Sequence, residues 1–401
     1  MPDREKQKGS LWTGRFLTVF VINILVNVSL YMVNTLIPKL ADYLAAPVAV
    51  IGAVVSMFAV TSLLARPFVG VSGSFLREEL ILRLSASVLV VAYALFGFAR
   101  SVPVVIAGRL IQGVGMAFVG PVCLTLAANA LPQSRISSGI AIFSIAQASA
   151  NAFGPSIGLW LSARFGYTPA FLISSALMLG CLFLSFNLPR SEEPTREKLH
   201  LSVYSVISRE ALIPGIIFFF LGGAYSCIVS YVVLYGESCG VTNCGLFFTS
   251  YAVFVVLSRL ISGRIGEKYG LSSVIIPAII CYAASFYFIS ISRSTLMFVL
   301  AGAVSALGYG VCQPSLQALS MLQVPENRRN AAGNTCYFGV DLGYLIMPSV
   351  SGAIVSSALS RGGSTTDGYV AMFRSMPISI LVALVIYLLF GRRLAEKNKA
   401  D

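Results

Sequence analysis

Long apolar segments separated by short polar connections dominate the sequence. A membrane-spanning helix needs about 20 largely apolar residues, because the hydrocarbon core is about 30 Å thick and each helical residue rises about 1.5 Å. By this measure the pattern predicts twelve spans, at 15–38, 47–70, 81–99, 103–130, 137–162, 168–189, 211–235, 243–263, 271–292, 295–321, 332–358 and 374–391. The longest polar stretch, 190–210, follows the sixth span. We therefore expect an all-α integral membrane protein with six-helix bundles at 1–189 and 211–401, joined by a linker at 190–210.

The composition agrees with a lipid environment. Of 401 residues, 57% are hydrophobic and 11% are charged, and mean hydropathy is +0.83. Soluble domains carry about 25% charged residues, which excludes an ordinary water-soluble fold. The first apolar run is longer than the core of a signal peptide, and no small-residue cleavage site follows it, so we expect a retained first helix.

The net charge of +12 is distributed unevenly. With twelve spans, most Lys and Arg residues of the N-terminus, the linker and the C-terminal tail fall on one side of the membrane. This asymmetry follows the positive-inside rule and predicts a multi-pass protein of the cell membrane with both termini in the cytoplasm. The positive-inside rule accounts for the net positive charge, because basic residues set the orientation of the chain in the membrane. We therefore expect no nucleic-acid partner.

The cysteine pattern leaves one question open. Most of the eight cysteines fall in or near predicted spans, where they act as small hydrophobes. Cys239 and Cys244 share the outer loop ESCGVTNCG. They either form a disulfide in an oxidising compartment or remain two free thiols.

The two halves of the chain repeat each other at an offset of 193 residues. Matching pairs include Ala59 with Ala252, Arg66 with Arg259, Gly70 with Gly263, Gly115 with Gly308, Pro121 with Pro314 and Pro155 with Pro348. Six helices return the chain to the same side, so the repeats are parallel. Such repeats place a substrate site near the membrane midplane, between halves that rock to give alternating access.

Two motifs resemble those of the major facilitator superfamily. RLIQGVG, residues 109–115, resembles the fourth-helix motif of the family. GPSIG, with Gly154, Pro155 and Gly158, resembles the fifth-helix motif of its exporters. The chain is similar to the twelve-helix proton-coupled drug and sugar efflux branch over essentially its whole length. The resemblance implies an exporter.

The resemblance also implies a gating loop after the second span and a second copy of this loop after the eighth. The first copy departs from the family pattern, because Ser74 stands where the family has aspartate. The second copy is closer, with a carboxylate and a base at the expected spacing. The residues implied in gating are Arg66, Gly70, Arg259, Gly263, Glu267 and Lys268.

Arg109 and Asp341 are the predicted proton-coupling residues. A charge inside the bilayer is costly and marks an ion or substrate pathway. Arginine stays protonated, so Arg109 cannot carry a proton itself. Burial disfavours a charged Asp341 whereas a nearby arginine favours it, and this competition suits a proton carrier, with Arg109 acting directly or through the cavity. The alternative is that the two residues form a fixed structural pair or join helices.

Other polar residues recur at helical spacing within the spans and predict the walls of a polar cavity. The alternative for each is a hydrogen bond that joins two helices. The set comprises Asn23, Asn27, Asn34, Gln112, Gln147, Asn151, Tyr225, Ser230, Tyr309, Gln313, Gln317, Tyr337 and Tyr344.

The leading functional hypothesis is a secondary active antiporter that exports a small, drug-like or sugar-like molecule against protons. The second is an uptake symporter or uniporter with the same fold. An integral membrane enzyme or receptor is the third; an enzyme needs clustered titratable groups, which the predicted spans lack. No metal-ligand spacing or phosphate-binding loop is present, so we expect no cofactor and no metal. We expect a monomer whose partners are its substrate, protons and the lipid bilayer.

Overall fold

The computed structural model describes residues 13–131, 136–190, 208–322, 324 and 329–391. Within these ranges all regular secondary structure is helical. The helices before the linker are α1 (Gly14–Tyr43), α2 (Val48–Phe75), α3 (Glu78–Phe98), α4 (Val102–Asn129), α5 (Ile136–Phe165) and α6 (Tyr167–Ser185). Those after it are α8 (Leu212–Ser238), α9 (Leu246–Tyr269), α10 (Ser272–Ile291), α11 (Thr295–Leu322), α12 (Arg329–Ser360) and α13 (Thr365–Ile386), with a π-helical turn at Tyr387–Gly391.

The helices have the length and apolarity that a bilayer requires. Among the described residues, 10 helices can cross a membrane. Their boundaries lie within a few residues of those expected from the sequence at most positions. The protein is therefore an all-helical, multi-span membrane protein, and the linker lies largely in 191–207, outside the described residues.

The predicted start of the last helix, residue 374, was wrong. Helix α13 begins at Thr365, because Ser364 and Asp367 form a capping box: the Ser364 Oγ accepts from the Asp367 backbone N–H at 3.2 Å, and the Asp367 carboxylate accepts from the Ser364 N–H at 3.0 Å. The polar sequence STTD resembles a loop when only hydropathy is considered. Arg374, expected as the first residue of this span, lies well inside α13 and is exposed.

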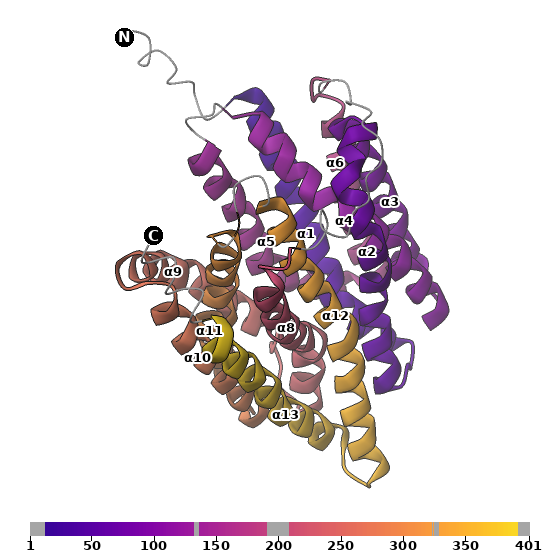
Figure 1. Ribbon diagram of the computed structural model, residues 1–401. Helices are drawn as coiled ribbons and strands as arrows, with labels where there is room; N and C mark the ends of the chain where they lie inside the picture. The colour runs from indigo at the N-terminus through magenta and orange to yellow at the C-terminus, as the bar shows by residue number, and fades with distance from the viewer. Residues whose placement is uncertain (1–12, 132–135, 191–207, 323, 325–328, 392–401) are drawn as a thin grey trace.

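The helices pack as two groups (Figure 1). In the N-terminal group, α1 packs against α5 and α6, and α3 against α4 and α6. In the C-terminal group, α8 packs against α12 and α13, and α10 against α11 and α13. The two groups meet chiefly along α2 with α12 and along α5 with α9. Any space for a substrate between the groups is therefore bordered by these four helices.

Glycines allow the helices of a group to approach closely. A Cβ atom on Gly113 of α4 would lie 2.1 Å from the Phe58 carbonyl oxygen of α2. A Cβ atom on Gly154 of α5 would lie 2.8 Å from the Cβ of Tyr31 on α1, and Gly158 packs against Met32 in the same way. The fourth-helix and fifth-helix motifs thus supply helix packing, as small residues do in membranes.

The two groups also contact each other tightly at one end of the bundle. We call the end where α1 begins the near end and the end where α1 finishes, at Tyr43, the far end. Toward the far end, Lys39 of α1 forms an ion pair with Glu237 of α8 at 2.5 Å. A Cβ atom on Gly52 of α2 would lie 2.2 Å from the Pro348 carbonyl oxygen of α12. The groups are therefore closed together at the far end.

Candidate transport site

An ion pair between the groups lies inside the bundle. The Nε of Arg66 on α2 donates to Oδ2 of Asp341 on α12 at 2.8 Å. The two side chains are only 11% and 10% exposed. The Ser62 hydroxyl, one helical turn from Arg66, donates to the same Oδ2 at 3.2 Å. Asp341 is thus bonded to one arginine and one hydroxyl, both from the opposite group.

The same pair is covered by residues from the C-terminal group. The guanidinium of Arg66 lies over the Tyr337 ring, 5.2 Å from its centroid. The Gln317 amide of α11 donates to the Tyr337 hydroxyl at 3.2 Å. Two predicted cavity residues therefore extend the network from α12 to α11, and Tyr337 is itself 43% exposed.

Arg109 has a separate network within the N-terminal group. Its guanidinium donates to Oδ1 of Asn34 at 2.9 Å, to Oε1 of Gln112 at 2.8 Å and to the Val55 carbonyl oxygen. It also lies over the Phe58 ring, 4.4 Å from the centroid. Arg109 is 1% exposed. Its hydrogen bonds join α1, α2 and α4, so its direct contacts are those of a residue that holds three helices together.

The structure therefore assigns the two predicted coupling residues to different partners. Asp341 is bonded to Arg66 and Ser62, and Arg109 to Asn34, Gln112 and Val55. A chain of ring contacts connects the networks, because Phe58 under Arg109 packs edge-on against Tyr344, 5.8 Å away. Arg109 and Asp341 therefore share no direct hydrogen bond or ion pair. Sequence reasoning missed Arg66 as the partner of Asp341, because residue 66 lies near the end of its predicted span, 47–70, and was assigned to gating.

Tyrosines from the C-terminal group line the interface. Tyr225 of α8 and Tyr309 of α11 stack with ring centroids 4.7 Å apart, and Tyr251 of α9 packs on Tyr225 at 5.6 Å. The Tyr225 hydroxyl donates across the interface to Oδ1 of Asn151 on α5 at 2.9 Å. Two predicted cavity residues, Tyr225 of the C-terminal group and Asn151 of the N-terminal group, are thus hydrogen-bonded to each other. The three rings are buried in this state, and their aromatic faces and phenol hydroxyls would suit an amphipathic organic molecule once the groups separate.

Arg259 of α9 adds a cation to this region. Its Nε donates to the Gly310 carbonyl oxygen of α11 at a long 3.4 Å. It lies close enough to the phenols of Tyr31 and Tyr251 to interact with them electrostatically. Among the described residues no carboxylate pairs with Arg259. Arg66, the equivalent residue of the first half, pairs with the Asp341 carboxylate. The two arginines therefore differ in whether their charge is balanced.

The remaining cavity residues divide into two sets. Asn23 donates to the Phe143 carbonyl oxygen of α5 at 3.0 Å, Asn27 donates to Asn23 at 2.8 Å, and the Ser230 hydroxyl donates to the Ser226 carbonyl oxygen of its own helix at 2.6 Å. These three side chains are buried; the Asn23 bond joins α1 to α5, whereas the other two bonds stay within one helix. Gln147 is exposed and Gln313 is partly exposed, which leaves both accessible to a solute.

The residues implied in gating lie within helices. Arg66 and Gly70 belong to α2, and Arg259, Gly263, Glu267 and Lys268 belong to α9. The side chain of Glu267 lies outside the described set, whereas Lys268 is exposed near the end of α9. Their positions near the same end of two matching helices agree with the internal repeat.

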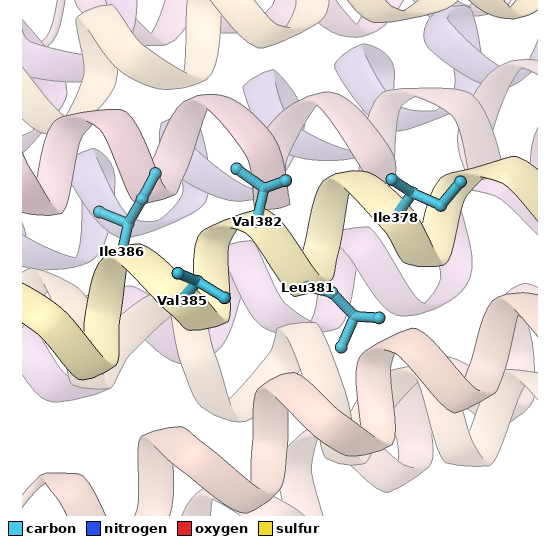
Figure 2. Close-up of a pocket in the computed structure, with 5 residues that line it drawn as sticks. All are labelled: Ile378, Leu381, Val382, Val385 and Ile386. Atoms are coloured by element: carbon cyan, nitrogen blue, oxygen red, sulfur yellow. The ribbon is translucent and has the colours of Figure 1, made fainter.

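The loop cysteines and the described surface hollow provide no further polar site. Cys239 and Cys244 are both free thiols, and the Cys244 Sγ donates to the Val233 carbonyl oxygen at 3.6 Å. The hollow in Figure 2 is lined by Ile378, Leu381, Val382, Val385 and Ile386, all on α13. Such an apolar, exposed helix face suits lipid tails rather than a polar substrate.

Comparison with known proteins gives the family. The model of the Major Facilitator Superfamily matches residues 19–248 and 241–401. The chain belongs to the Major Facilitator Superfamily. The tight contact of α2 with α12 and of α5 with α9 is thus the contact between two halves of a facilitator fold. This superfamily membership makes the chain a membrane transporter of a small molecule, and not an enzyme.

Individual relatives include exporters. The chain is 22% identical over 356 residues to the staphylopine export protein of Staphylococcus aureus (strain Mu50), covering 84% of this chain and 89% of that protein. It is 25% identical over 329 residues to the multidrug resistance protein MdtG of Dickeya zeae (strain Ech586), covering 77% of each. Its fold is similar to the crystal structure of the nucleoside transporter NupG, with a TM-score of 0.76, 13% identity and coverage of 94% of this chain and 99% of that one. The chain thus resembles the drug efflux branch of the superfamily.

Proposed function

We propose that this transporter is a proton-coupled exporter in which Asp341 carries the proton and Arg66 controls its release. The ion pair between these residues supports the proposal most directly. It is buried, it joins the two groups, and it contains a carboxylate in the middle of a helix. An intramembrane carboxylate paired with a cation is the arrangement that proton relays use.

The proposed membrane layout gives this chemistry a direction. All twelve helices span the bilayer, including the 30-residue α5 and the 24-residue α9, as two repeats at 1–189 and 211–401 joined by the linker at 190–210. The near end faces the cytoplasm, because the positive-inside rule assigns the basic termini and linker of the sequence to the cytoplasmic side. The far end, held by Lys39 and Glu237, then faces outward and is closed.

In the state closed at the far end, Arg66 favours charged Asp341 and releases its proton toward the cytoplasm. The α2–α12 interface has to rearrange when the groups rock. In the opposite state, a buried Asp341 without Arg66 favours the neutral acid and takes a proton from outside. Each cycle then moves a proton inward while the substrate moves outward. Arg109 acts on this equilibrium without a direct bond to Asp341, and Phe58 and Tyr344 lie between the two networks.

The names of the relatives support export. The staphylopine export protein and the multidrug resistance protein MdtG each match most of this chain. The fifth-helix motif with Gly154, Pro155 and Gly158 also resembles that of exporters. These observations favour efflux over the uptake symporter or uniporter.

The test uses inside-out vesicles with an imposed proton gradient. A panel of drugs, sugars and small metabolites is added, and the dissipation of the gradient is followed for wild type, Asp341→Asn and the control Asp367→Asn. Asp367 is a carboxylate in the first turn of α13, at the far end and outside the interface. We expect substrate-dependent proton release in wild type and control but not in Asp341→Asn. Substrate flux that moves no protons in wild type would overturn the proposal.

A further inference from the structure

The charges in the middle of the helices do not balance. Away from the helix ends, Arg66, Arg109 and Arg259 face the interior of the described bundle together with one carboxylate, Asp341; the other buried carboxylate, Glu79, lies in the first turn of α3. Asp341 is paired with Arg66. Arg109 and Arg259 therefore have no carboxylate partner among the described residues. Uncompensated charge inside a membrane is costly and marks a binding site for an opposite charge.

The two unpaired arginines differ in what they have left to offer. Arg109 is 1% exposed and gives hydrogen bonds to three acceptors of its own group. Arg259 is partly exposed and makes one long bond, to the Gly310 carbonyl oxygen at 3.4 Å. A guanidinium has five N–H donors, so most donors of Arg259 have no acceptor among the described residues. Arg259 is the cation that remains available to a ligand.

The internal repeat explains why Arg259 lacks a partner. Arg66 and Arg259 are equivalent, since 259 − 66 = 193, and Asp341 shifted by the same offset falls on 341 − 193 = 148, which is Ala148. Arg66 pairs with Asp341, whereas the position equivalent to Asp341 in the first half holds alanine, which has no carboxylate to offer Arg259. The carboxylate missing from this pair is a group that a substrate can supply.

The surroundings of Arg259 suit an organic ion rather than an inorganic one. It lies on the same helix, α9, as Tyr251. Tyr251 continues into the stacked rings of Tyr225 and Tyr309, at centroid distances of 5.6 Å and then 4.7 Å. Aromatic faces bind apolar or aromatic skeletons, and a guanidinium binds carboxylate oxygens in a bidentate manner.

We propose that the substrate of this transporter is an organic anion, whose carboxylate binds the Arg259 guanidinium and whose apolar or aromatic part packs on Tyr225, Tyr251 and Tyr309. The inference rests on the proposed export function, because it assigns the substrate class of the same central site. In this proposal the Arg66–Asp341 pair carries the proton, and Arg259 binds the negative charge of the substrate.

The test measures binding without transport. Protein in lipid nanodiscs is dialysed against three probes that share one ring system: 1-naphthoate (anion), 1-naphthamide (neutral) and 1-naphthylmethylammonium (cation). The variants are Arg259→Gln, Arg259→Lys and the control Arg374→Gln, which removes an exposed arginine of α13. Empty nanodiscs report partition into lipid. The fraction of monodisperse protein reports folding.

We expect wild type and Arg374→Gln to bind naphthoate at least tenfold more tightly than the cation. Arg259→Gln should lose about tenfold or more of the naphthoate affinity, a loss that removal of one charge-assisted pair produces. Arg259→Lys should retain part of it. Preference for the cation, no naphthoate binding in wild type, or equal naphthoate binding in wild type and Arg259→Gln would overturn the inference.

The failure of this inference is distinguishable from that of the proposed function. Naphthoate that binds through Arg259 but moves no protons in vesicles would remove proton coupling and leave the anion site in place. Proton release by cationic or neutral compounds, lost in Asp341→Asn, would keep the exporter and remove the anion.

Discussion

Arg66 and Asp341 form an ion pair of 2.8 Å that joins helices from opposite halves of the chain, 275 residues apart in sequence. Because both side chains are nearly enclosed, water cannot solvate one charge when its partner is removed. The pair is therefore a structural contact between the two groups as well as the proposed proton site, and the two roles are separable by experiment.

Removal of one partner should destabilise the protein more than removal of both. Breaking a buried ion pair costs about 3–5 kcal/mol, because the remaining charge is left without compensation. We expect Arg66→Gln to lower the thermal unfolding temperature and Arg66→Gln/Asp341→Asn to recover most of the loss. The measurement is unfolding in detergent at neutral pH, with Arg374→Gln as the unaffected control. Additive effects of the two single substitutions would contradict the pairing.

The ion pair between Lys39 and Glu237 should control opening of the far end rather than stability. The side chains are 19% and 43% exposed, and exposed pairs contribute only ~0–1 kcal/mol. Lys39→Glu would place like charges opposite each other and favour the state open at the far end. We expect faster reaction of an impermeant maleimide, added outside, with a cysteine introduced at Ser349, between α2 and α12.

The matched variant for this experiment is Lys39→Arg, which keeps the attraction and should leave the labelling rate unchanged. Labelling of protein without the introduced cysteine gives the background from the native thiols. Equal labelling of Ser349→Cys in wild type and Lys39→Glu would show that the ion pair has no part in closure.

Gly52 should be intolerant of even one added methyl group. Its Cβ position lies 2.2 Å from the Pro348 carbonyl oxygen and 2.6 Å from the Tyr231 hydroxyl, which itself donates to that carbonyl at 2.8 Å. Gly52→Ala must move α2 away from α12, and overpacking of this kind costs about 1–3 kcal/mol. We expect a lower unfolding temperature and reduced transport in reconstituted vesicles.

Gly120 of α4 is the control for this substitution. No atom lies within 4 Å of its Cβ position. Gly120→Ala should therefore be neutral or stabilise α4 by about 0.5–1 kcal/mol, since alanine has the higher helix propensity. If Gly52→Ala and Gly120→Ala lowered the unfolding temperature and transport by similar amounts, crowding at the α2–α12 contact would not be the cause of the loss.

Cys244 should react slowly with alkylating reagents at neutral pH. Burial, with a further contribution from the Glu237 carboxylate, raises the pKa of the Cys244 thiol to about 11. Only the thiolate reacts, so at pH 8 about one molecule in a thousand is reactive, and the rate should rise about tenfold per pH unit until the pH approaches 11. Mass spectrometry of iodoacetamide-treated protein at pH 7, 8 and 9 measures this.

A reducing agent provides the complementary observation. Since Cys239 and Cys244 are free thiols, dithiothreitol should leave the unfolding temperature unchanged. A decrease on reduction, together with protection of both cysteines from alkylation before it, would show that they are bridged.

The sequence by itself determined the class of the protein and most of its helices, because spanning a bilayer imposes a length and an apolarity that one chain segment displays alone. The failure at residue 374 shows the limit: the capping box of Ser364 and Asp367 extends α13 through polar residues that hydropathy assigns to a loop. The family motifs also identified the glycines that pack α4 and α5, since close approach requires a small residue whatever the partner.

Only the tertiary structure decided which polar groups meet. Arg66, Arg109 and Arg259 are each an arginine in an apolar helix, and nothing local to them distinguishes the ion-paired residue from the residue that joins three helices or from the residue with free donors. Their roles depend on contacts across groups of helices that are distant in sequence. Helical spacing fixes which face a side chain occupies, whereas the packing of α2 on α12 and of α9 on α11 fixes what that face contacts.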